Sequence, residues 1–112
     1  MRALAAELLH EHGLISEALS RLPGGLSGAA IRRVRDLVDR HHRKEEGILF
    51  PALVRARPDL GSRIGHLHLE HARGAALFDR LERGDRRVLG RLLRLYADHI
   101  ADENRIFRSM VS

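Results

Sequence analysis

A histidine and a glutamate interrupt an apolar helical stripe near the middle of the chain. Between Ile31 and Ile48, stripe residues recur at alternating steps of three and four, the spacing of a helix that packs in a bundle. His41 and Glu45 occupy stripe positions where leucine is expected. Residues four apart share a helix face, so an imidazole and a carboxylate should lie side by side in the interior. A buried carboxylate is costly without a partner, and a metal ion is the simplest partner that suits both groups.

Similar stripes run through three other segments, and each contains a histidine. The four stripes are Leu4, Leu8, His12, Ile15, Leu19 and Leu22; Ile31, Val34, Val38, His41, Glu45, Ile48 and Ala52; Ile64, Leu67, His71, Gly74, Phe78 and Leu81; and Leu92, Tyr96, His99, Glu103, Ile106 and Met110. Proline and glycine separate the segments. The pattern predicts helices over about 2–21, 28–56, 60–83 and 86–112, with Pro51 kinking the second. Because the connections are short, we expect an all-α fold, an up-down-up-down four-helix bundle, as a single domain over residues 1–112.

Counting along each helix places the polar stripe residues at a similar depth. Each lies about 10–14 residues from the nearest connection, or roughly 15–20 Å at 1.5 Å per residue. The candidate metal ligands are His12, His41, Glu45, His71, His99 and Glu103. Imidazole and carboxylate ligands without sulfur suit iron, manganese or zinc. Two bridging carboxylates with two histidines on each metal form a dinuclear centre, and an oxo or hydroxo bridge would still leave a position for a small molecule.

Other polar residues near the stripes have plainer roles. A single buried histidine is usually a hydrogen-bonded packing residue. Here that explanation would have to apply to four histidines, next to two buried glutamates whose negative charge it leaves uncompensated. We expect the remaining histidines at the surface: His10, His42, His66 and His68. Glu46 and Glu70 are expected at the surface or as hydrogen-bond partners of ligand histidines. Whether either of them, or His68, joins the metal ligands stays open at this point, and Tyr96 is expected in the core.

Composition narrows the function classes. The absence of cysteine excludes thiolate metal sites, iron–sulfur clusters and disulfides. The net charge is +5, but basic residues are interleaved with acidic ones throughout, so no specific nucleic-acid binding is expected. No apolar run is long enough for a signal peptide or a membrane span, so we expect a cytoplasmic protein.

Four short motifs link the sequence to a known family. They are Glu11-His12 with Ile15; His41-x-x-x-Glu45-Glu46 followed by Leu49-Phe50-Pro51; Glu70-His71; and His99-x-x-x-Glu103 with Ile106-Phe107. Together they resemble the hemerythrin-like, or HHE cation-binding, family over essentially the whole chain. The resemblance implies a four-helix bundle with a non-haem di-iron centre, and roles in oxygen or nitric oxide binding, iron handling and stress response. The oxygen carriers usually have a histidine where Leu67 stands, and they end in His-x-x-x-x-Asp instead of the present His-x-x-x-Glu.

We therefore expect a protein that binds or senses oxygen or nitric oxide, or handles iron, through a four-histidine, two-glutamate dinuclear centre. The expected cofactor is two iron ions with an oxo or hydroxo bridge, with manganese or zinc as alternatives. A binding protein is expected, not an enzyme, acting as a monomer or homodimer. The alternatives are a di-iron oxidase or peroxidase on the same site, and a metal-free helical interaction module.

Overall fold

Helices begin and end where the local sequence requires. The computed structural model describes residues 1–111. The elements are α1 (Arg2–Arg21), the 3-10 turn η1 (Leu22–Gly24), α2 (Gly28–Lys44), the π-helical turn η2 (Glu45–Leu49), α3 (Phe50–Ala56), η3 (Pro58–Leu60), α4 (Gly61–Glu82), η4 (Arg86–Val88) and α5 (Leu89–Val111). Ser27 caps α2 by accepting a hydrogen bond from the Ala30 N–H at 3.0 Å. Gly84 follows the end of α4 with φ +96°, a left-handed backbone conformation in which a residue with a side chain would be strained.

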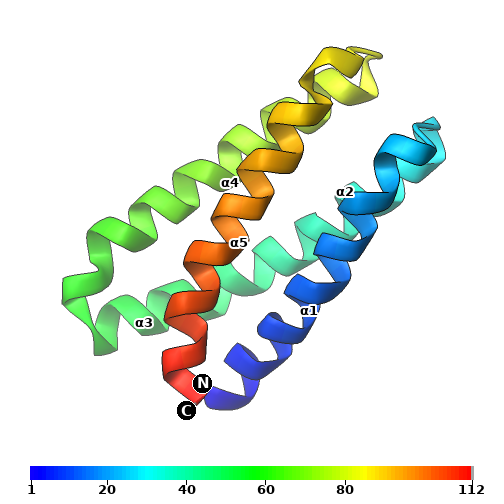
Figure 1. Ribbon diagram of the computed structural model, residues 1–112. Helices are drawn as coiled ribbons and strands as arrows, with labels where there is room; N and C mark the ends of the chain where they lie inside the picture. Colours follow the sequence, from blue (N-terminus) through cyan, green and yellow to red (C-terminus); the bar gives the residue numbers. More distant parts are fainter. Residues whose placement is uncertain (112) are drawn as a thin grey trace.

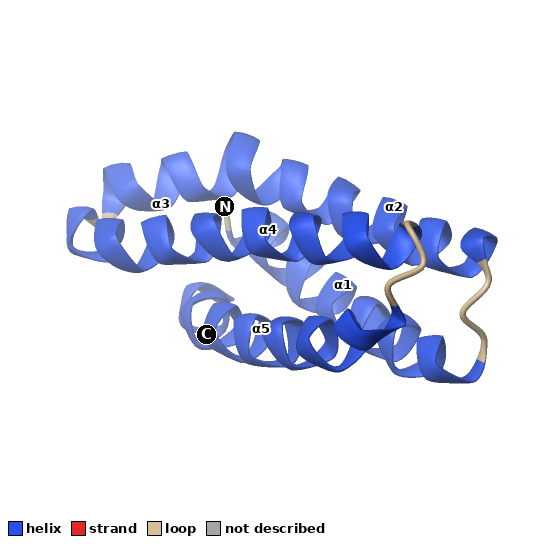
Figure 2. Cartoon of the chain, turned by 90° about the horizontal axis from the view of Figure 1, so that it is seen from above, coloured by secondary structure: helices blue, strands red, loops and turns tan. Residues whose placement is uncertain are grey.

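The helices form a four-membered antiparallel ring. The segments α2, η2 and α3 follow one another without a break and act as one long arm. α1 packs against α2 and α5, and α4 packs against the same two neighbours. Both chain termini lie toward the end of the bundle that holds η3 (Figures 1 and 2). The predicted all-α, up-down-up-down four-helix bundle is confirmed, and the described residues contain no strand and no helix of the length and hydropathy that crossing a bilayer requires.

Two apolar clusters fill the bundle, one toward each end. The first lies near the η1 and η4 connections and includes Leu22, Val38, Phe78 and Val88. The second lies near the termini and η3, and it is built from Ala5, Leu8, Leu49, Phe50, Leu53, Ile64, Leu67, Ile106 and Phe107. The polar stripe residues come between the two clusters along each helix. The two apolar clusters therefore exclude water from the polar groups on both sides.

The π-helical turn η2 changes which face of the second arm is buried. The Phe50 N–H bonds to the Glu45 carbonyl five residues back, so this turn holds one more residue than an α-helical turn. Ile48, expected in the core from its spacing, is 55% exposed, whereas Leu49 is fully buried. In an α-helix residue 51 would donate its N–H to the carbonyl of Gly47, which lies inside this turn, but Pro51 has no N–H. The wider π-helical turn is compatible with the loss of that hydrogen bond. The predicted burial of Ile48 is wrong because the sequence pattern assumed an unbroken α-helix.

Candidate metal centre

All six residues expected as metal ligands meet at one level of the bundle. They are His12 from α1, His41 from α2, Glu45 from η2, His71 from α4, and His99 and Glu103 from α5. Their exposed fractions run from 0% to 5%, so each polar group is removed from bulk water. Helical phase explains the convergence, because each residue replaces an apolar one on the inward face of its helix. The structure thus brings together every residue of the predicted set.

The first pair of imidazoles comes from α1 and α2. The ring centroids of His12 and His41 are 4.7 Å apart. His12 Nε2 lies 2.9 Å from Glu103 Oε1, and His41 Nε2 lies 3.1 Å from Glu45 Oε2. Ligand atoms of these four residues all lie within 4.8 Å of one another, close enough to surround one ion. We name this space position A.

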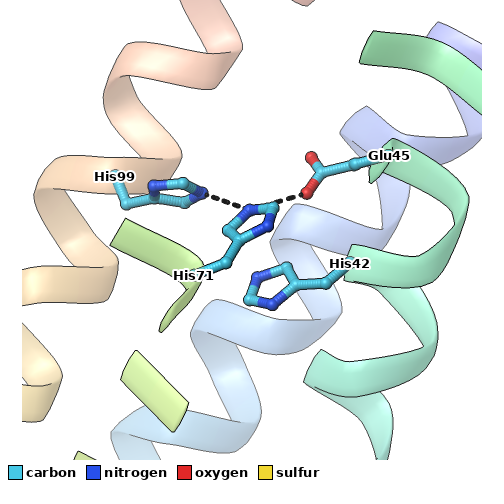
Figure 3. A group of neighbouring side chains, drawn as sticks. All are labelled: His42, Glu45, His71 and His99. Carbon is cyan, nitrogen blue, oxygen red and sulfur yellow. Dashed lines mark hydrogen bonds and ion pairs between the residues drawn. The ribbon is translucent and has the colours of Figure 1, made fainter. Parts of the chain in front are cut away.

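The second pair comes from α4 and α5. The Nε2 atoms of His71 and His99 are only 3.0 Å apart. Figure 3 draws this contact together with the contact between His71 and Glu45. His71 Nε2 lies 3.2 Å from Glu45 Oε1, and His99 Nε2 lies 3.1 Å from Glu103 Oε2. Both carboxylates therefore contact a histidine of each pair. We name the space beside His71 and His99 position B.

The atoms at the centre suit metal cations. Glu45 Oε1 and Glu103 Oε2 are buried and have no hydrogen-bond partner. Two ring nitrogens 3.0 Å apart, as in His71 and His99, repel unless a proton or a cation lies between their lone pairs. Leaving buried carboxylate oxygens uncompensated is expensive, whereas nitrogen and oxygen donors of this kind bind iron, manganese or zinc. The residues present therefore fit a dinuclear metal group.

A ring of outer acceptors fixes the orientation of each imidazole. The Nδ1 contacts are His12 to Asn104 Oδ1 at 2.6 Å, His41 to Glu11 Oε1 at 2.9 Å, His71 to Glu46 Oε2 at 2.7 Å, and His99 to Glu70 Oε1 at 2.9 Å. An Nδ1–H that donates outward leaves the Nε2 lone pair facing inward, as a metal ligand requires. Each acceptor comes from a helix next to that of its histidine in the ring.

The sequence holds a signal for these outer acceptors. Glu11, Glu46, Glu70 and Asn104 each lie directly beside a site residue in the chain. The expectation that Glu46 and Glu70 hydrogen-bond ligand histidines is confirmed. The roles of Glu11 and Asn104 were missed, although both, like Glu46 and Glu70, adjoin a stripe residue in the chain.

Comparison with known proteins agrees with this geometry. The family model of the hemerythrin HHE cation binding domain matches residues 1–111. The chain belongs to this family. Searches of curated proteins and of solved structures gave no match. Cation binding is thus supported both by the family and by the His/Glu cluster of this hemerythrin domain.

Protons take the place of cations when this HHE domain holds no metal. Burial alone would lower the pKa of His12, but hydrogen bonds to Glu103 and Glu45 outweigh it and raise that pKa to about 9. Burial likewise opposes protonation of His71, while Glu103 and Glu45 raise its pKa to about 10. Burial raises the pKa of Glu103, but hydrogen bonds from three histidines bring it well below the usual value. Protonated His12 and His71 therefore lie against the ionised Glu103 carboxylate at neutral pH.

His42 is one histidine that sequence spacing misplaced. It was expected at the surface, but it is half-buried, and its ring stacks on His71 with centroids 3.5 Å apart and planes 11° from parallel. Burial, followed by the charge of His71, lowers the pKa of His42 to about 2, so the ring is neutral. A ligand nitrogen of His42 lies within 4.8 Å of those of Glu45, His71 and His99. The His42 ring therefore lies beside position B, stacked on His71, and could contribute a nitrogen to an ion held there (Figure 3).

The other histidines are confirmed as exposed, and one of them marks an opening toward the HHE site. His10, His66 and His68 are all exposed. His68 Nδ1 lies 3.4 Å from Glu46 Oε2 and so contacts an outer acceptor. An open hollow of about 380 Å³ between α2 and α4 is lined by Asp39, His42, Arg43, Glu46, His68, His71, Ala72 and Ala75. This hollow brings the molecular surface up to His71, a residue of position B.

Proposed function

We propose that this hemerythrin HHE domain is a non-haem di-iron protein that binds or senses oxygen or nitric oxide, or handles iron. His12 and His41 would hold one iron, His71 and His99 the other, and Glu45 and Glu103 would bridge both. The supporting observation is that two buried carboxylates, Glu45 and Glu103, lie 2.9–3.2 Å from the four inward-facing Nε2 atoms. Among the described residues, the oxygens Glu45 Oε1 and Glu103 Oε2 have only ion-pair contacts with these histidines and accept no hydrogen bond of regular geometry. The bound pair, with an oxo or hydroxo bridge, supplies Lewis-acid and redox chemistry; manganese or zinc would fit the same donors.

The chain's own residues prepare the site for this role. The four outer acceptors hold the imidazoles with Nε2 inward, which lowers the reorganisation needed when metal binds. The two apolar clusters exclude water on either side, and the low local dielectric strengthens the attraction between carboxylates and cations. Both clusters take residues from all four arms, which supports residues 1–112 as a single domain.

A small molecule has both a position and a route. Four histidines and two carboxylates, shared between two ions, do not fill all the ligand positions of both ions. Leu67 stands where oxygen carriers usually have a further histidine, and its side chain has no donor atom. The hollow beside His42 and His71 offers a path of suitable size for a diatomic molecule. The same opening would admit peroxide, which is why a di-iron oxidase or peroxidase is the second candidate function.

Iron content tests the metal proposal directly. After anaerobic reconstitution with Fe²⁺ and desalting, we expect two irons per chain by elemental analysis, and near-ultraviolet absorption after oxidation. His71→Ala should lower the iron content, whereas His10→Ala, at an exposed position outside the site, should leave it unchanged. A wild-type protein that stays folded and free of metal under these conditions would contradict the proposal.

Ligand binding and turnover separate the two candidate functions. Nitric oxide or oxygen added to the reduced protein should change its visible spectrum with saturation at a fixed stoichiometry. Continuous consumption of oxygen or peroxide in the presence of a reductant, followed with an electrode, would assign the enzyme function instead. No spectral change and no consumption would restrict the protein to iron handling.

A further inference from the structure

The outer partners of position B are two carboxylates that form no ion pair with a lysine or arginine among the described residues. His71 and His99 contact Glu46 and Glu70 through Nδ1, so both imidazoles of this pair donate to carboxylates. The other groups that contact them are exposed imidazoles, His68 with Glu46 and His66 with Glu70, each at 3.4 Å.

The outer partners of position A are different. His12 contacts the amide oxygen of Asn104, which has no net charge. His41 contacts Glu11, but Glu11 Oε2 lies 2.5 Å from the Lys44 ammonium. Position A therefore has one neutral acceptor and one carboxylate that is paired with Lys44, an ammonium that also contacts Glu7 at 3.1 Å.

This difference changes how strongly each pair donates to a cation. A hydrogen bond from Nδ1–H to a carboxylate makes the opposite nitrogen more basic, and does so more than a hydrogen bond to an amide. The Glu46 and Glu70 carboxylates, which have no lysine or arginine partner among the described residues, also attract a cation through space. Glu45 and Glu103 contact both pairs, so they cannot produce the difference.

We propose that the two metal positions are unequal and fill in order: position B, at His71 and His99, binds the first divalent cation, and position A binds the second. The inference rests on the proposed metal-binding function and adds an order to it. The chain then has a stable one-metal form with an empty position A. The hollow beside His42 and His71 lies on the side of position B.

Zinc locates the first ion without changing the chain. Zn²⁺ is diamagnetic in its complexes and is not redox-active, so it can be added to the metal-free protein while the histidine ring ¹⁵N resonances are followed by NMR. Up to one equivalent, we expect the Nε2 resonances of His71 and His99 to move, and those of His12 and His41 to move only during the second equivalent. Simultaneous movement of all four, or movement of His12 and His41 first, would overturn the ordering.

Paired variants, studied by zinc calorimetry, then test whether the charge of the outer acceptors causes the order in which the two positions fill. Glu70→Gln keeps the size of the side chain and removes its charge, and it should weaken the first binding step about 10–100-fold. Glu11→Gln, the matched change at position A, should leave the first step unchanged and weaken the second. Asn104→Asp should strengthen the second step.

The outcomes separate this inference from the function on which it depends. A wild-type chain that binds no zinc or iron refutes the proposed function. Two ions bound with indistinguishable constants refute only the ordering. A first step weakened by Glu11→Gln and unaffected by Glu70→Gln would reverse the assignment of the two positions.

Discussion

Metal binding should release protons, and their number should follow from the pKa values of the site histidines. The perturbation is the addition of zinc to the metal-free protein at constant pH. His12 and His71, with pKa values of about 9 and about 10, are protonated at pH 8. A histidine must lose its inward proton to ligate a metal, so each displaced proton enters the buffer.

The expected number follows from the two pKa values. At pH 8 the protonated fractions of His12 and His71 are about 0.91 and about 0.99, so zinc should displace about 1.9 protons from this pair. At pH 9 the same calculation gives about 1.4. Histidines with the ordinary pKa of about 6.5 would release fewer than about 0.1 at pH 8. Glu103 is already ionised, because its pKa lies well below the usual value, and contributes none.

Calorimetry in buffers of different ionisation enthalpy measures this number. The slope of the observed binding enthalpy against the buffer enthalpy gives the protons released, and a parallel titration of zinc into a chelator corrects for metal–buffer complexes. Because the pKa of His99 is raised as well, the pair's value of about 1.9 is a lower bound, and a slope of about two or more at pH 8 that decreases at pH 9 supports the charge balance described for the site. A slope near zero at pH 8 would refute it, because the imidazoles would then be neutral before zinc arrives.

Three further predictions concern stability, measured by urea unfolding with chelator present. Gly74→Ala should lower the free energy of unfolding by about 1–2 kcal/mol, because an ideal Cβ would lie 2.7 Å from Tyr96 Cζ and the cost of overpacking exceeds the helix gain. Gly65→Ala, which meets nothing within 4 Å in the same helix, should instead raise it by about 0.5–1 kcal/mol, and equal effects at the two sites would contradict the packing argument. Ser27→Ala should cost about 1 kcal/mol, since the Ala30 N–H loses its acceptor; no change would mean that water caps the helix equally well. The raised pKa values of His12 and His71 stabilise the metal-free fold fully below about pH 6.5 and progressively less as the pH rises through about 9 and about 10. The free energy of unfolding should therefore fall between pH 7 and 10, and a rise would contradict this reasoning.

The stripes alone determined most of the bundle and the six central residues. Local periodicity identifies the inward face of each helix, and distance from the connections gives a residue's height, so His12 and His99 could be brought to one level without knowledge of any contact. The N-cap at Ser27 and the stop at Gly84 are equally local, because they depend on a few neighbouring backbone groups.

Contacts between helices were decided only in the tertiary structure. Periodicity does not give the rotation of one helix against the next, which places Glu11 on His41 and stacks His42 on His71. Nor does it anticipate the π turn that exposes Ile48, because that turn changes the period itself. The difference between positions A and B likewise arises from side chains of neighbouring helices, so the sequence could predict two metal positions but not that they are unequal.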